Sequence, residues 1–167
     1  ARQVKIGEVV VNMFGGVGCF SIIMAKHAKA QKIYSIDINP YAVKYMSENA
    51  RLNRVDGIVE TIEGDAKTII ENRLRGVADR VLMPLPEKAY EYLGHAIMAL
   101  RPGEETIHYY DFEHAKKDEE PIEKIERKVS EKLRLLNVDF KISFGRIVRT
   151  VGPRWHQVAL DISVRKQ

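Results

Sequence analysis

The sequence is poor in cysteine and in long hydrophobic runs. Cys19 is the single cysteine among 167 residues, which excludes an internal disulfide framework and a cysteine-rich zinc site. No apolar stretch reaches membrane-spanning length, and the first residues lack the organisation of a signal peptide. We therefore expect a protein without a metal ion and without a membrane partner, and a cytoplasmic location is the simplest interpretation.

Neither sign of charge dominates the chain. Lys and Arg number 27 against 23 Asp and Glu, which gives a formal net charge of +4. This balance permits a nucleic-acid partner but does not demonstrate one. Hydrophobic residues at 45% and charged residues at 30% are typical of a soluble globular protein. Without an internal repeat or a low-complexity tract, we expect one domain over residues 1–167, and a monomer is the simplest oligomeric state.

Short apolar runs alternate with segments of helical spacing. Strands are expected within residues 8–14, 32–38, 58–66, 78–86 and 102–112, and helices within residues 19–30, 40–55, 65–74 and 87–100. The highly charged segment 113–134 is expected to be mostly one solvent-facing helix, with Pro121 near its start. Residues 140–152 and 155–166 predict two strands joined as a hairpin.

This alternation predicts a doubly wound, Rossmann-like α/β sheet that ends in an antiparallel strand pair. In such open sheets the ligand lies outside the carboxyl ends of the parallel strands, where the strand order reverses. Four of the predicted strand ends carry unusual residues, and all four would lie on that edge.

The first strand ends in the glycine-rich stretch "NMFGGVGCF" (12–20). From Gly16 the chain reads G-V-G-C-F-S, which breaks the G-x-G-x-x-G fingerprint of dinucleotide binding. The stretch instead follows the N/D-x-F-x-G-x-G pattern that is typical of S-adenosylmethionine (SAM) binding. The alternative is that the glycines only form a tight turn. The candidate cofactor residues here are Asn12, Phe14, Gly15, Gly16, Val17 and Gly18.

The second and third strands each end in an aspartate. Asp37, followed by Ile38, is placed to accept hydrogen bonds from two ribose hydroxyls, although it could instead cap the next helix. Asp65 can accept from an adenine amino group, and Ala66 would leave the adenine face open. Asp is also a common N-cap residue, so Asp65 is a weak signal unless it follows the other two.

The fourth strand ends in Pro84-Leu85-Pro86. Two prolines separated by one residue form a rigid loop with few hydrogen-bond donors. In many methyltransferases that act on nitrogen, this loop carries an Asn that holds the acceptor. We expect Pro84, Leu85 and Pro86 to form the floor of the catalytic pocket, and the alternative is simple termination of the strand.

These motifs, together with "IHYYDF" and "RIVRTVGPRWHQVALDISV", resemble the catalytic domain of the archaeal and eukaryal tRNA (guanine-N1)-methyltransferases. The resemblance runs in order across nearly the whole chain. It implies a class I SAM-dependent fold and methyl transfer from SAM to guanine N1 at tRNA position 37. It also implies S-adenosylhomocysteine (SAH) as the product and tRNA as the partner.

Three departures from the family pattern carry expectations of their own. Asn12 stands where the family usually has Asp, which reduces the charge near the SAM amino group. Pro84 replaces the family's Asn, and the resulting apolar floor would suit the tricyclic base 4-demethylwyosine. The family's proposed general base, a Glu, and a supporting Arg lie upstream of Ala1. We therefore expect an amino-terminal RNA-binding part outside this chain and no catalytic base within it.

Residues of the last hairpin are the candidates for tRNA contact. Arg146, Arg149 and Arg154 would hold phosphate, and Trp155, followed by His156, would stack on a base. The alternative is that the arginines are solvated and that Trp155 closes the end of the core. His108-Tyr109-Tyr110 is expected to end the fifth strand near the pocket, in a packing role.

Other functions stay open at this stage. The related aminocarboxypropyl transferases of the wybutosine pathway share the framework and the cofactor. The chain could also be a SAM-binding module that is inactive without its missing segment. An NAD-dependent oxidoreductase is disfavoured by the broken glycine fingerprint.

Overall fold

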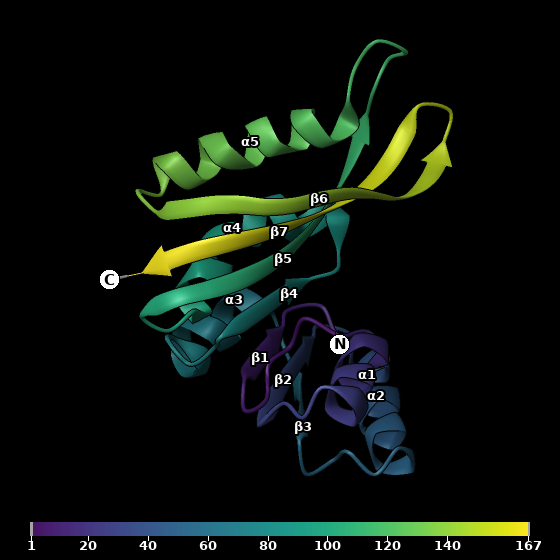
Figure 1. The fold of residues 1–167 in the computed structure, drawn as a ribbon. Helices are drawn as coiled ribbons and strands as arrows, with labels where there is room; N and C mark the ends of the chain where they lie inside the picture. The colour runs from purple at the N-terminus through teal and green to yellow at the C-terminus, as the bar shows by residue number, and fades with distance from the viewer. Residues whose placement is uncertain (1, 167) are drawn as a thin grey trace.

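A computed structural model describes residues 2–166, which form one seven-stranded sheet with helices on both faces (Figure 1). The strands are β1 (Val9–Asn12), β2 (Lys32–Asp37), β3 (Val59–Glu63), β4 (Arg80–Met83), β5 (Gly103–His114), β6 (Asp139–Gly152) and β7 (Trp155–Lys166). The helices are α1 (Cys19–His27), α2 (Pro40–Leu52), α3 (Ala66–Ile69), the π-helical turn η1 (Ile70–Leu74), α4 (Pro86–Ala99) and α5 (Pro121–Leu135). The fold class expected from the sequence is confirmed.

The strand order is β3-β2-β1-β4-β5-β7-β6. Strands β1 to β5 are parallel, whereas β7 pairs antiparallel with both β5 and β6. The chain runs from β1 outward to β3 and then returns to β4 on the other side of β1. The order therefore reverses between β1 and β4, and open α/β sheets bind their ligands at this switch point.

Alternate residues of each central strand face two separate apolar layers. On β1, Val10 packs in the layer formed with α1 and α2, whereas Val11 packs in the larger layer formed with α4 and α5. On β4, Leu82 and Val81 divide in the same way. Because both faces are covered, these short strands read as continuous apolar runs in the sequence.

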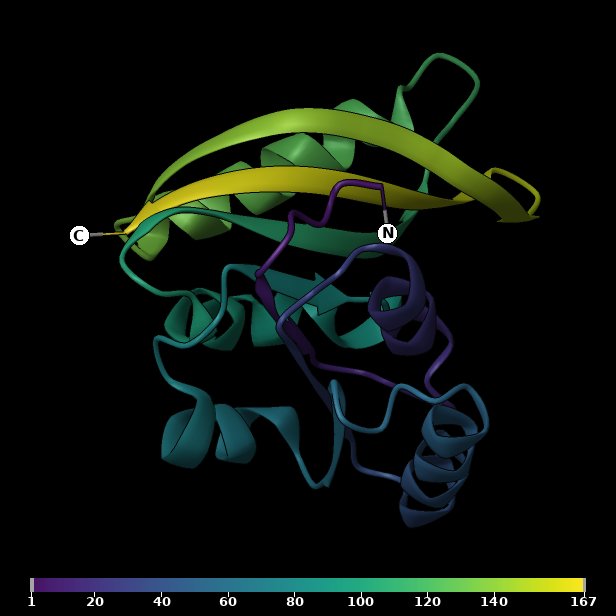
Figure 2. The same cartoon turned by 60° about the horizontal axis from the view of Figure 1, so that its bottom comes forward.

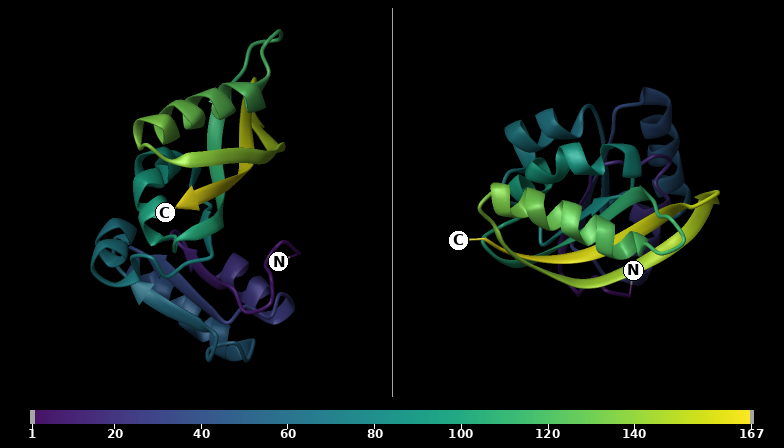
Figure 3. Two further views of the ribbon diagram at one scale, coloured as in Figure 1. Left: turned by 60° about the vertical axis from the view of Figure 1, so that its left-hand side comes forward. Right: turned by 90° about the horizontal axis from the view of Figure 1, so that it is seen from above.

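Strand β5 continues well past its parallel neighbour. Met83, the last residue of β4, pairs with Tyr109, and β5 then extends through residues 110–114. At about 3.3 Å per residue, this extension reaches roughly 16 Å beyond the carboxyl edge of the sheet. The end of β6 and the start of β7 accompany it, so this hairpin projects from the body of the sheet (Figures 1 and 3).

The amino-terminal residues cross the sheet on the face opposite α5 (Figure 2). Gln3 Nε2 donates to Asp161 on β7, and the Gln3 carbonyl accepts from Arg80 on β4. Glu8 binds the buried Arg80 guanidinium with both carboxylate oxygens, at 2.7 and 3.0 Å. This paired geometry satisfies a charge that would otherwise be costly to bury.

Several sequence expectations about element boundaries are wrong. The helix expected over 65–74 divides into α3 and the π-helical turn η1. The charged helix begins at Pro121, as expected, but it buries Ile125, Val129 and Leu133 instead of facing solvent throughout. His108-Tyr109-Tyr110 lies in the middle of β5 rather than at its end, because pairing with β7 extends this strand to His114.

Across residues 2–166, the helices are too short or too polar to span a membrane.

Candidate active site

A cavity of about 440 Å³ opens at the carboxyl ends of β1 to β4. Its volume falls within the range of small-molecule sites. Its walls combine apolar side chains with two carboxylates and one phenol. The lining residues are Met13, Phe14, Gly16, Asp37, Ile38, Gly64, Asp65, Ala66, Pro84, Leu85, Lys88 and Tyr92. The structure thus brings residues from all four strand-end motifs to one place.

The glycine loop adopts backbone conformations that side chains rarely tolerate. Gly16 and Gly18 have φ angles of 55° and 95°, in the left-handed region. A Cβ on Gly15 would lie 2.5 Å from Ser35 Oγ, so this glycine serves the close approach of the loop to β2. Only Gly16 of the three lines the cavity. Gly15 and Gly18 do not line the cavity but allow the conformation of the loop, and the Val17 side chain is exposed to solvent.

Asp37 joins the glycine loop to the second strand. Its Oδ2 accepts from the Gly16 N–H at 2.8 Å, and its Oδ1 accepts from the Asn39 N–H at 2.9 Å. The capping of α2 is done by Asn39, whose side chain accepts from the Tyr41 N–H. Asp37 is therefore free of the capping role. It lines the cavity, and each carboxylate oxygen keeps a lone pair for a further donor.

Asp65 caps α3 and also contacts α4. Its Oδ1 accepts from the Lys67 N–H at 2.7 Å, and its Oδ2 accepts from the Tyr92 hydroxyl at 2.7 Å. Burial raises the pKa of Asp65, but these bonds and the Lys67 charge outweigh it and leave the pKa below its usual value. Burial and the Asp65 carboxylate together raise the pKa of Tyr92 to about 12. The pair is thus a carboxylate and a neutral phenol at neutral pH.

The three residues of the proline loop do not share one position: two line the cavity and one begins α4. Pro84 and Leu85 line the cavity. Pro86 is buried in the first turn of α4, where its missing N–H and fixed φ suit the start of a helix. Pro86 therefore lies outside the cavity lining, in contrast to the expectation for the whole loop.

Asn12 does not line the cavity but belongs to a buried network of hydrogen-bonded side chains. Its side chain is 0% exposed, and Nδ2 donates to Ser21 Oγ, which in turn bonds Ser35 Oγ at 2.8 Å. Within residues 2–166, Asn12 Oδ1 is the buried side-chain atom without a hydrogen-bond partner. A buried acceptor without a donor is unfavourable, so this atom marks a place where a ligand group or a water molecule would stabilise the site.

A second cavity of about 400 Å³ lies beside α1, on the face crossed by residues 2–4. His108 on its wall receives a hydrogen bond from Arg80 at Nε2, so its proton sits on Nδ1 and donates to Asp161 at 2.6 Å. Burial raises the pKa of Asp161, but the hydrogen bonds from His108 and Gln3 outweigh burial and leave the pKa below its usual value. These contacts tie β4, β5 and β7 together.

The hairpin residues expected to contact tRNA lie on the projecting part of β6 and β7 or at its base. Trp155 is 46% exposed, with its ring edge-on to His114 at 5.4 Å, so it does not close the core. Arg149 and Arg154 are exposed near the tip, whereas Arg146 lines the second cavity at the base. The hairpin rises from the same sheet edge that carries the first cavity.

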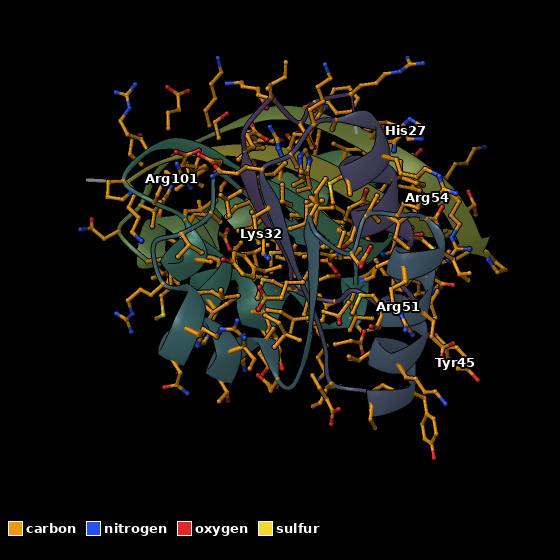
Figure 4. The ribbon with its side chains drawn as sticks, turned by 90° about the horizontal axis from the view of Figure 1, so that it is seen from below. His27, Lys32, Tyr45, Arg51, Arg54 and Arg101 are labelled. Carbon is orange, nitrogen blue, oxygen red and sulfur yellow. The ribbon has the colours of Figure 1, made fainter. Side chains whose placement is uncertain are left out.

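Other basic side chains lie away from that edge. Arg51 and Arg54 come from the end of α2 and the turn after it, and His27 ends α1 (Figure 4). Both helices end near the edge where the parallel strands begin. Arg101, labelled on the other side of the same view, precedes β5. These residues are therefore not part of the cavity wall.

Sequence reasoning missed Lys88 and Tyr92, both of which line the cavity from α4. The two residues are four positions apart and so lie on one face of the helix. Phe14 packs its ring edge-on against Tyr92 at 5.2 Å. The helical spacing of Lys88 and Tyr92 after the proline loop could have indicated a shared helix face. That spacing does not distinguish a residue of the cavity wall from a residue of the core. Within residues 2–166, no cluster of three potential metal ligands occurs.

Comparisons with other proteins identify close relatives of this chain. A family model described as the TRM5/TYW2 methyltransferase domain matches residues 1–137. The chain is 38% identical over 163 residues to the tRNA (guanine(37)-N(1))-methyltransferase Trm5b of Pyrococcus abyssi, covering 98% of this chain and 46% of that protein. It is 40% identical over 167 residues to the tRNA 4-demethylwyosine(37)-methyltransferase Taw21 of Saccharolobus solfataricus, covering 97% and 56% respectively.

Solved structures show the same similarity. The crystal structure of Pyrococcus abyssi Trm5b matches with a TM-score of 0.84 and 38% identity, covering 99% of this chain and 46% of that one. Methanocaldococcus jannaschii TYW2, solved in complex with AdoMet, matches with a TM-score of 0.83 and 27% identity, covering 99% and 72%. The chain spans about half the length of the curated relatives that it matches.

Proposed function

This chain belongs to the TRM5/TYW2 methyltransferase domain family, and on that premise we propose that it is the catalytic domain of a SAM-dependent tRNA methyltransferase. The acceptor is N1 of guanosine at tRNA position 37. The observation that carries the proposal is the cavity at the switch point, where Asp37 and Asp65 meet around the left-handed Gly16.

The residues present fit SAM. Asp37 would accept from the ribose hydroxyls with the lone pairs that the loop leaves free. Asp65 would accept from the adenine amino group, and Ile38, Ala66 and Leu85 supply apolar walls for the ring. A TYW2 structure in complex with AdoMet supports the assignment by homology.

When bound, SAM supplies an electrophilic methyl group on its sulfonium. The chain's own residues have a positioning role: they hold the acceptor nitrogen in line with that methyl group and exclude other nucleophiles. A bond forms between N1 and the methyl carbon while the carbon–sulfur bond breaks, and the N1 proton leaves to a base. Among residues 2–166, the carboxylates that line the cavity are Asp37 and Asp65, and both already serve as acceptors for neighbouring groups. We therefore propose that the base comes from outside these residues.

The wall formed by Pro84 and Leu85 favours a second acceptor, 4-demethylwyosine. Proline provides no side-chain amide for the guanine edge, so the wall recognises the base by shape and apolar contact. A tricyclic base offers more apolar area than guanine. The relative Taw21, at 40% identity, bears the name of a 4-demethylwyosine methyltransferase.

The projecting hairpin is the proposed contact for tRNA. Exposed Trp155 offers a surface for stacking, and Arg149 and Arg154 near the tip offer cationic contacts for phosphate. Because the hairpin rises from the edge that holds the cofactor cavity, RNA bound there would lie next to the reaction site. A structure of the related aTrm5 in complex with tRNALeu supports tRNA as the partner by homology.

The test is transfer of label to tRNA by the full-length protein that contains this chain. Unmodified tRNA, or tRNA carrying 4-demethylwyosine, is incubated with methyl-labelled SAM and then digested to nucleosides. Labelled N1-methylguanosine or isowyosine is the expected product. Label that appears only when the aminocarboxypropyl part of SAM is labelled would assign the other transfer reaction of the family. No label from either position would refute the proposed function.

A further inference from the structure

The side chain of Tyr92 lies on the cavity wall and links the middle of α4 to Asp65, the residue that follows β3 and Gly64. Tyr92 is 9% exposed, and its hydroxyl donates to Asp65 Oδ2 at 2.7 Å. Its ring is held on two sides, by the edge of Phe14 at 5.2 Å and by Lys67 Nζ at 4.4 Å from its centroid. A phenol fixed in this way has little freedom to point elsewhere.

Two fixed donors determine what Asp65 can still do. The Lys67 N–H occupies one oxygen and the Tyr92 hydroxyl occupies the other. Each oxygen of an ionised carboxylate has a further lone pair, so Asp65 can accept additional bonds. With a donor on each oxygen, however, the ionised form is favoured and the carboxylate has no proton to donate.

The charged side chains around Asp65 are themselves paired with other groups. Lys67 lies on α3, and its ammonium also pairs with Glu91 on α4. Lys88, on the cavity wall, is 3.8 Å from the same Glu91. Asp37 faces the cavity from β2, where its oxygens are bonded to backbone N–H groups. The Tyr92 hydroxyl is thus the neutral side-chain donor that holds Asp65 in place.

We propose that Tyr92 is a positioning residue that fixes the orientation of the Asp65 carboxylate toward the adenine amino group and thereby selects adenine over hypoxanthine in the cofactor. The inference rests on the proposed function, because it concerns the nucleoside part of SAM. Adenine offers an amino group to the Asp65 carboxylate. Hypoxanthine has a carbonyl oxygen at the same position, so it would face an acceptor that has no proton to give.

Removal of the phenol hydroxyl releases one carboxylate oxygen. In Tyr92→Phe, Asp65 keeps its bond from the Lys67 N–H, but the oxygen that Tyr92 held is released and the carboxylate can rotate. A carboxylate that can rotate can turn away from the hypoxanthine oxygen and accept from the neighbouring ring N1–H, so the penalty for the wrong base falls. The ring of Phe retains the contacts with Phe14 and Lys67, so the fold should not change.

The experiment compares calorimetric affinities for SAH and S-inosylhomocysteine in the wild type and in variants. Tyr90→Phe is the matched control, since Tyr90 lies on the same helix but faces Lys128 and Lys132 rather than the cavity. Asp65→Asn shows that the assay responds to loss of the carboxylate. Melting temperatures establish that each variant is folded.

We expect the wild type and Tyr90→Phe to prefer SAH by at least about thirtyfold, the scale of an unpaired polar group in a binding site. Tyr92→Phe should narrow this preference by about tenfold, mostly through tighter binding of S-inosylhomocysteine. An unchanged preference in a folded Tyr92→Phe would overturn the inference while leaving SAM binding intact. If the wild type binds neither ligand, the proposed cofactor fails, and the inference falls with it.

Discussion

Replacement of Asp37 is the perturbation whose effects the structure specifies most fully. The carboxylate accepts from two backbone N–H groups, those of Gly16 at 2.8 Å and Asn39 at 2.9 Å, and is the proposed acceptor for the ribose. In Asp37→Ala, the glycine loop loses its bond to the end of β2 and the ribose loses its partner. Both stability and ligand affinity should therefore fall.

The two effects have separate magnitudes. Hydrogen bonds to a charged group contribute about 1.5–3 kcal/mol each when buried, so two partly exposed bonds suggest a loss of about 1–3 kcal/mol of unfolding free energy. For a domain of this size each kcal/mol corresponds to roughly 2–4 °C in melting temperature. Affinity for SAH should fall at least about tenfold, equivalent to roughly 1.4 kcal/mol.

Calorimetric titration with SAH, together with thermal melts, measures both effects. Glu63→Ala is the matched control, because Glu63 pairs with Asp37 at the end of the neighbouring strand but is exposed and outside the cavity lining. Its SAH affinity should stay within about twofold of the wild type, below the smallest loss expected for Asp37. A folded Asp37→Ala that binds SAH as well as the control would refute the ribose assignment.

Three further predictions concern other parts of the molecule. In the full-length enzyme, Pro84→Asn should shift the ratio of rates in favour of guanosine over 4-demethylwyosine, and identical ratios would show that the loop does not select the base. Trp155→Ala should weaken tRNA binding by roughly five- to a hundredfold, the scale of one lost base stack, with SAH affinity unchanged; equal tRNA affinity would place the RNA elsewhere. Burial and the neighbouring Asp79 carboxylate raise the pKa of Glu105 to about 7. The Glu105 carboxyl therefore binds its proton more tightly in the folded state than in the unfolded state, and the protein loses stability as pH rises from about 4.5 to above 7. Glu105→Gln should therefore raise the melting temperature at pH 8 and leave it unchanged at pH 4, and equal gains at both values would contradict the assigned cause.

The sequence predicts the strand-end motifs because each depends on local chemistry. Gly16 and Gly18 have left-handed backbones that follow from their lack of a side chain, and Asp37 follows a strand whose apolar run is unambiguous. Parallel strands bring their carboxyl ends to one edge, so the meeting of these motifs follows from the fold class alone.

What the sequence does not predict depends on contacts between distant segments. The bond from Tyr92 to Asp65 joins residues 27 positions apart, and a tyrosine at helical spacing has the pattern of a core residue. The placement of His108 within β5 depends on pairing with β7, which extends the strand beyond its apolar run. Asn12 is visible as a departure from the family pattern, but its unpartnered Oδ1 appears only once Ser21 and Ser35 are in place.

Titration of this chain with SAH by calorimetry, with and without excess NAD, tests most directly the claim that the switch-point cavity is a SAM site. We expect saturable one-to-one binding of SAH that NAD does not displace. Absence of binding by the folded chain, or displacement of SAH by NAD, would contradict it.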